Sequence, residues 1–138
     1  MGPTRPHMPA WPVRPIIPFP VLNFLKPLGI FHLAIFYNFN PSLDDCVAAG
    51  GHFNPFNEVH GGPTDPNRHV GDLGNIVTAA GASSTFVDVT NNLITLFDGT
   101  ANIVDRMLVI HAGEDDFSGA SGNAGSRVAC GIVELTSS

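Results

Sequence analysis

Three histidines and an aspartate stand close together in residues 50–75, GGHFNPFNEVHGGPTDPNRHVGDLGN. They are His52, His60, His69 and Asp72. Imidazole nitrogens and carboxylate oxygens are ligands of tetrahedral Zn²⁺, at about 2.0–2.2 Å. The glycines and prolines of the stretch let a loop bend until such ligands converge. The pattern predicts a metal-binding loop; the alternative is a set of solvated loop histidines or of turn and capping partners.

Two further histidines adjoin apolar runs. His111 ends the run MLVI, and His32 stands inside LGIFHLAIFYNF, residues 28–39. This second run is long enough for one buried strand or one short helix, and its periodicity does not decide between them. His32 is therefore either a metal ligand or a histidine packed among aromatic side chains.

Short β-type runs with turn residues between them must position these side chains. Residues 85–89 and 94–97 alternate between the two faces of a strand, Asp98-Gly99 is a turn signal, and residues 107–110 and 128–135 are of the buried type. No helix longer than two turns is predicted. Such spacing is typical of an antiparallel sandwich or barrel.

Composition excludes several function classes. The chain has 138 residues, 43% of them apolar and 13% charged, which suits one small domain. Its formal net charge of −6 argues against a basic nucleic-acid surface. No apolar run reaches the length of about 18 residues that a membrane-spanning helix needs.

The chain divides into two segments. Residues 1–43 carry three basic residues and no acidic one, and eight of the 12 prolines precede residue 28. We therefore expect a proline-rich segment, 1–43, that is extended over residues 1–20, and a domain, 44–138. The prolines also make a secretory signal a poor fit. A cytoplasmic location is expected, with secretion as the alternative.

Five motifs in residues 46–134 carry a family resemblance. They are GGHFNP, HGGP, RHVGDLGN, LVIHAGEDD and GNAGSRVACGI, and in this order they resemble the copper,zinc superoxide dismutases. The resemblance implies an all-β, Greek-key β-sandwich or barrel, here incomplete at its N-terminal strands. It also implies the reaction 2 O₂⁻ + 2 H⁺ → O₂ + H₂O₂, an antioxidant activity.

The resemblance also implies residue roles. His52 resembles the histidine that bridges copper and zinc and exchanges a proton in the reaction, and Arg127 resembles the arginine that guides superoxide. The remaining roles, again by resemblance, are His60, His69 and Asp72 as zinc ligands, His111 as a copper ligand, Asp115 as the carboxylate that links histidines of the two metal sites, and Cys46 with Cys130 as an intrachain disulfide.

The copper site departs from the family pattern. Family members carry a His-x-His pair that supplies two copper ligands, and no such pair occurs in this sequence. An alignment without a gap puts Ile35 and Tyr37 at the two positions. A shifted alignment of FHLAIF puts His32 at one and Ala34 at the other. The fullest copper set is then His32, His52 and His111, which leaves the copper site incomplete. The loop after Asp116 is also shorter than is usual in the family.

Three hypotheses for the function follow. The first is a superoxide dismutase that uses Zn²⁺ and Cu²⁺, weakened by the incomplete copper site. The second is a non-catalytic zinc-binding module that simply binds metal or dimerises, either with itself or with a full-length relative. The third is a truncated isoform, joined to an unrelated start near Asp44, that does not fold stably. The partners expected are superoxide and a second chain, with no nucleic acid and no membrane.

Overall fold

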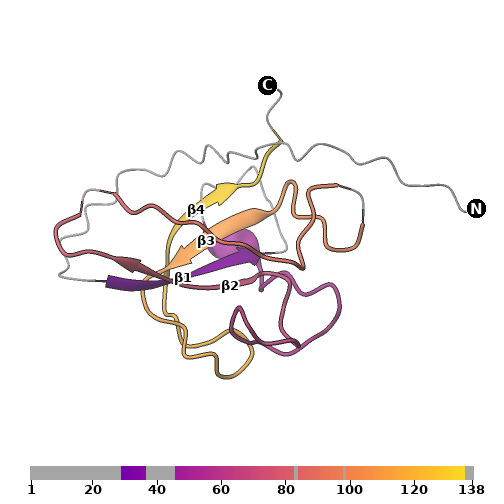
Figure 1. The fold of residues 1–138 in the computed structure, drawn as a ribbon, viewed down its shortest axis with the longest axis horizontal. Helices are drawn as coiled ribbons and strands as arrows, with labels where there is room; N and C mark the ends of the chain where they lie inside the picture. Colours follow the sequence, from indigo (N-terminus) through magenta and orange to yellow (C-terminus); the bar gives the residue numbers. More distant parts are fainter. Residues whose placement is uncertain (1–28, 37–45, 83, 98, 136–138) are drawn as a thin grey trace, which may run out of the picture.

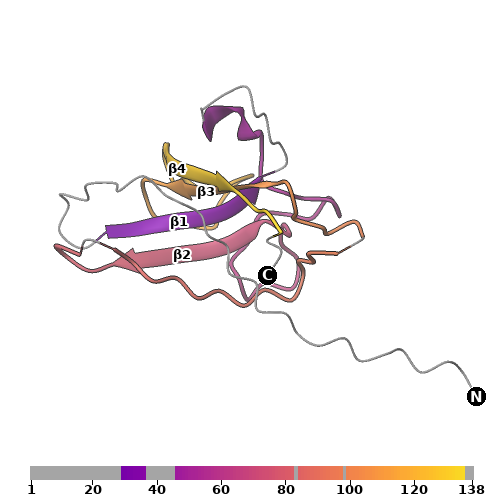
Figure 2. The same cartoon turned by 90° about the horizontal axis from the view of Figure 1, so that it is seen from above.

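Four antiparallel strands form one sheet in this computed structural model, which describes residues 29–36, 46–82, 84–97 and 99–135 (Figure 1). The strands are β1 (Gly29–Phe36), β2 (Asp72–Thr78), β3 (Met107–His111) and β4 (Arg127–Ile132), in the order β2-β1-β3-β4. A short 3₁₀ helix, η1 (Cys46–Ala49), lies beside β4 (Figure 2). The predicted all-β class is confirmed.

Strand β1 lies inside the sheet, between β2 and β3. Its odd and even positions face opposite sides, as in any strand. Ala34 and Phe36 pack with Met107 and Val109 on one side, whereas Ile35 packs into a second cluster on the other. Because both faces and both edges of β1 are covered, its sequence is apolar almost throughout. The run whose periodicity was undecided is thus a strand.

A ring of backbone hydrogen bonds ties the long loop after η1 to β1. The Ile35 N–H donates to the Gly71 carbonyl at 2.9 Å, and the Gly71 N–H donates to the Phe53 carbonyl at 2.9 Å. The Phe53 N–H closes the ring on the Ile35 carbonyl at 2.7 Å. A Cβ at position 71 would overlap the Ile35 carbonyl oxygen, so the close approach requires glycine. The ring places both ends of the predicted metal-binding loop against the centre of the sheet.

Two predicted strands are wrong. Residues 84–90 form no strand in the described part of the chain, and Phe86 is 92% exposed. Residues 94–97 contain only an isolated bridge from Thr95 to Asn102. Alternation produces a strand only where a neighbouring strand accepts its hydrogen bonds, and neither segment has one among the described residues. Asp98 of the predicted turn lies outside the described residues.

The remaining predictions for local structure fare better. The run 107–110 lies in β3, and the run 128–135 overlaps β4, which ends at Ile132. Strand β2 was not predicted, since its sequence DLGNIVT alternates poorly. The extended form of residues 1–20 lies outside the described part, and the division at residue 43 stays a prediction. The described residues contain no helix long and apolar enough to cross a membrane.

Candidate metal centre

The carboxylate of Asp72, at the start of β2, is the meeting point of three imidazoles. Its Oδ1 lies 2.8 Å from Nδ1 of His52, 3.1 Å from Nδ1 of His60 and 3.2 Å from Nδ1 of His69. One ligand atom from each of the four residues lies within 4.8 Å of the others, and all four residues are buried. Four buried donors that converge in this way suit a tetrahedral cation such as Zn²⁺.

The Asp72 carboxylate is held in place and kept ionised. Its Oδ2 accepts hydrogen bonds from the backbone N–H of Gly61, at 3.1 Å, and of His69, at 3.0 Å. Burial alone would raise the pKa of Asp72, but hydrogen bonds from His52, His69 and Gly61 outweigh it and hold that pKa well below its usual value. The group therefore keeps a negative charge for a cation at any physiological pH.

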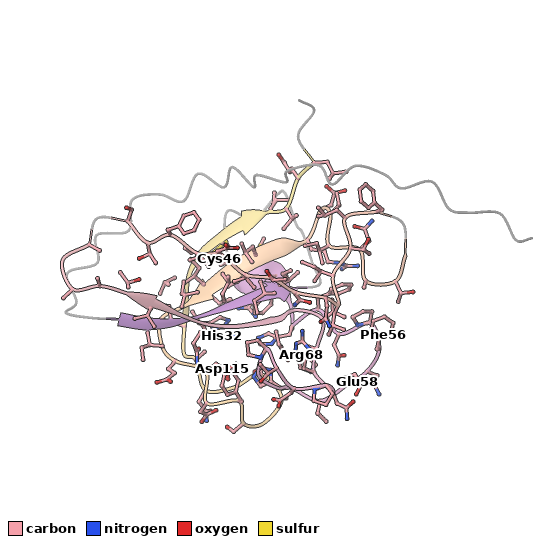
Figure 3. The ribbon with its side chains drawn as sticks, in the orientation of Figure 1. His32, Cys46, Phe56, Glu58, Arg68 and Asp115 are labelled. Carbon is pink, nitrogen blue, oxygen red and sulfur yellow. A yellow bond between two sulfur atoms is a disulfide. The ribbon has the colours of Figure 1, made fainter. Side chains whose placement is uncertain are left out.

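Asp115 is a second meeting point, in the loop between β3 and β4 (Figure 3). Its Oδ2 lies 2.8 Å from His60 Nε2 and 3.3 Å from His32 Nδ1, with all three side chains fully buried. The first contact suits the His60 tautomer with its proton on Nε2, because a carboxylate oxygen accepts that hydrogen bond. His60 Nδ1 is then the atom with a free lone pair, and it is the one that faces Asp72.

A second group of imidazoles lies on the other side of His52. The ring centroid of His32 is 5.5 Å from that of His52 and 5.6 Å from that of His111. The two strand residues face each other, because His32 of β1 pairs with His111 of β3. His32, His52 and His111 each have a buried Nε2 with no hydrogen-bond partner. Buried imidazole nitrogens without a hydrogen-bond partner are suited to bind a second metal ion.

Two histidines of this second group, His32 and His111, are neutral near neutral pH. The Nδ1–H of His111 donates to the Gly125 carbonyl at 2.9 Å, which leaves the lone pair on Nε2. Burial lowers the pKa of His111, and it lowers the pKa of His32 to about 4 against an opposing effect of Asp115. Neutral imidazoles are the form that binds metal.

Ala34 stands two residues after His32 in β1, and the strand register shows which way its side chain faces. Ala34 lies on the same face as Phe36, pairs with Val109 and is completely buried. Ile35 belongs to the cluster on the opposite face, so its side chain is directed away from the imidazoles. Tyr37 lies outside the described residues. The register is that of the shifted alignment, and among the described residues the second group contributes three imidazoles.

Arg127 begins β4 directly opposite His111. Its guanidinium donates to the Cys46 carbonyl, at 2.8 Å, and to the Gly50 carbonyl, and lies 4.4 Å above the Phe36 ring. Cys46 and Cys130 form the predicted disulfide, which ties η1 to β4. Together these contacts fix the chain that leads into His52.

Two supporting residues were not singled out from the sequence. Asn75 of β2 donates from Nδ2 to the Asp115 carbonyl and accepts from the Asp115 N–H, each at 2.9 Å. The ring of Phe117 packs near His60, and its N–H donates to Asp115 Oδ1 at 2.8 Å. Asn75 is the last residue of the motif RHVGDLGN. Its neighbours in sequence do not show that its side chain bonds to a residue 40 positions away.

An all-β sheet with a buried cluster of three histidines and an aspartate defines a metal-binding β protein of the superoxide dismutase type. The copper/zinc superoxide dismutase family model matches residues 23–133, and so reaches beyond the motifs that begin at Cys46. The chain belongs to this family. The match indicates an oxidoreductase that acts on superoxide.

Known proteins support this assignment. Superoxide dismutase (Cu-Zn) 5 of Dictyostelium discoideum is 45% identical over 113 residues, covering 77% of this chain and 71% of the relative. The clock protein EA4 has a similar structure, with a TM-score of 0.70, 35% identity and coverage of 80% and 73% of the two chains. A point mutant of a superoxide dismutase-like protein from Bacillus subtilis gives a TM-score of 0.69, 32% identity and coverage of 82% and 77%.

Proposed function

We propose that this chain dismutes superoxide with one zinc ion held by His52, His60, His69 and Asp72 and one copper ion held by His32, His52 and His111. One observation carries the proposal: His52 belongs to both groups. Its Nδ1 lies 2.8 Å from Asp72 Oδ1, and its buried Nε2 has no hydrogen-bond partner and belongs to the group with His32 and His111.

The donor sets suit the two ions. Three imidazoles and a carboxylate complete a closed zinc site. Three imidazoles suffice to hold copper, which stands high in the affinity order for nitrogen ligands. When bound, copper supplies one-electron redox chemistry, and zinc supplies none. The chemistry of the donors therefore supports both ions, with the copper set one nitrogen short.

The chain's own residues have three tasks. His52 Nε2 holds and releases the proton that the reaction consumes, because it is the buried imidazole nitrogen shared by the two groups. Arg127 attracts the superoxide anion with a guanidinium fixed beside Gly50 and Phe36. Asp115 orients His60 and His32 together, as carboxylates behind metal-binding histidines do.

A specific observation favours a second candidate, a zinc-binding module without dismutase activity. Ala34 leaves the copper group with no fourth nitrogen among the described residues, whereas the zinc group is complete. The copper group is His32, His52 and His111, and the zinc group is His52, His60, His69 and Asp72. Such a module requires zinc alone.

The experiment is metal analysis of the purified chain after loading with Zn²⁺ and Cu²⁺, with superoxide dismutation assayed on the same sample. The proposal expects one zinc and one copper per chain, and activity above that of free copper. Zinc without copper and without activity would leave the zinc-binding module. A matched control is Asp116→Asn, an exposed neighbour of Asp115, which should change neither metal content nor activity.

We further propose self-association and a cytoplasmic location. Large apolar side chains are exposed in the described part, among them Phe86 at 92%, Phe97 at 69% and Val77 at 59%, and apolar surface of this kind favours association. Sedimentation analysis of the loaded chain, alone and mixed with a full-length relative, tests which dimer forms. A fluorescent fusion tests the location.

A further inference from the structure

A surface cavity of about 690 Å³ opens on the zinc group and reaches the copper group only at the shared His52. Its lining includes three of the four zinc-group residues, His52, His60 and His69, and neither His32 nor His111. The other lining residues come from the loop before His60 and from the loop between β3 and β4: Gly51, Asn54, Asn57, Glu58, Val59, Gly119 and Ala120.

One side chain of the zinc group, that of His69, is more exposed than the others. The side chain of His69 is 9% exposed, whereas those of His52, His60 and Asp72 are at most 1% exposed. An ion that arrives through the cavity therefore meets His69 first. The other three side chains are more fully buried, and Asp72 does not line the cavity.

One acidic residue, Glu58, is among the residues that line the cavity, and it is exposed. The backbone of Glu58 is held by Asn54, whose Nδ2 donates to the Glu58 carbonyl at 2.8 Å and whose Oδ1 accepts from the Glu58 N–H at 2.9 Å. Among the described residues, no lysine or arginine lines the cavity. An acidic residue in the lining without such a cation attracts a metal ion and repels an anion, so this opening does not suit superoxide.

We infer that this cavity is the route by which Zn²⁺ reaches and leaves its ligands, with Glu58 drawing the ion in and His69 as the first ligand it meets. The inference rests on the proposed zinc site. It separates the zinc path from the surface around Arg127, because Arg127 does not line the cavity.

The first test measures the rate at which the metal-free, disulfide-bonded chain takes up Zn²⁺, by stopped-flow with a zinc indicator. Glu58→Gln should slow uptake about threefold at about 0.01 M salt, and the difference should vanish at about 0.5 M salt, where charge is screened. Glu134→Gln, which removes an exposed charge outside the cavity, should leave the rate unchanged. Equal rates for Glu58→Gln and the wild type would overturn the route.

A second variant tests the path without a change of charge. Ala120→Leu adds bulk to an exposed position of the lining, so it should slow zinc uptake and chelator-driven zinc loss by the same factor and leave zinc affinity unchanged. Unaltered rates in this variant would also contradict the route. If the wild type bound no zinc, the proposed function and the route would both fall, whereas stoichiometric zinc with unchanged rates would overturn the route alone.

Discussion

Asp115 accepts a hydrogen bond from His60 at 2.8 Å, and the same Oδ2 lies 3.3 Å from Nδ1 of His32. One carboxylate oxygen thus touches one histidine from each proposed metal site. The link spans the loop after β3, the metal-binding loop and β1. Because an imidazole binds metal only in the correct tautomer and orientation, this carboxylate couples the two sites.

Replacing Asp115 by Asn should weaken zinc binding. The amide removes the negative charge that favours the Nε2–H tautomer of His60, and loss of such a partner costs about 10- to 100-fold in metal affinity. Competition titration with a zinc chelator measures the change. Asp116→Asn, one residue along and exposed, is the matched control. Equal zinc affinity in the wild type and Asp115→Asn would contradict the coupling.

Replacing Ala34 by His should add the missing nitrogen to the copper group. Ala34 is fully buried beside Phe36 and Val109, so the larger side chain should destabilise the metal-free chain by about 1–3 kcal/mol. Copper affinity should nevertheless rise by about tenfold, which corresponds to about 1.4 kcal/mol. Electron paramagnetic resonance of the Cu²⁺-loaded chain should change from a three-nitrogen to a four-nitrogen pattern. An identical spectrum in the two chains would show that position 34 does not face copper.

The metal-free chain should lose stability as the pH falls from neutral. Burial lowers the pKa of His32 to about 4 from 6.5, so between these values the unfolded chain binds a proton that the folded chain does not. Stability is therefore fully present above about pH 6.5 and falls by about 2 kcal/mol on reaching about pH 5. Urea unfolding at the two pH values measures the loss.

The control for this pH dependence is His32→Gln, which removes the titrating group. Its unfolding free energy should fall less over the same interval, although His111, whose pKa is also lowered by burial, contributes in the same direction. An equally steep fall in the variant would assign the effect to other groups.

Loss of the disulfide between Cys46 and Cys130 should destabilise the fold strongly. The bond closes a loop with a sequence separation of 84 residues, and the chain-entropy estimate for such a loop is about 4 kcal/mol. The double variant Cys46→Ser with Cys130→Ser, compared with the oxidised wild type by urea unfolding, measures the cost. A difference below about 1 kcal/mol would mean that η1 is held to β4 mainly by other contacts.

Much of the candidate site could be predicted from the sequence because its residues are few, chemically distinctive and grouped. Three of the four zinc-group residues are histidines in one glycine-rich loop, and β2 begins at the fourth, Asp72. The disulfide and the strand before His111 were also correctly predicted. The strand predicted from the alternation of residues 85–89 is absent from this described part of the chain. Alternation shows that a segment could lie in a sheet, but it does not show that a partner strand exists.

The sequence alone did not decide whether His32 is a metal ligand or a histidine packed among aromatic side chains, because its surroundings depend on the fold. Its neighbours in sequence are apolar, but its neighbours in space are His52, His60, His111 and Asp115, which come from three other segments. The register of β1 against β3 brings His32 opposite His111, and no local pattern encodes register. The same holds for Asn75, whose partner lies in a distant loop.

The central claim is that His52 serves both metal sites, and metal analysis of three single variants tests it most directly. After loading with Zn²⁺ and Cu²⁺, His69→Ala should lose zinc and keep copper, and His111→Ala should lose copper and keep zinc. His52→Ala should lose both. Retention of a full equivalent of either metal by His52→Ala would contradict the shared ligand.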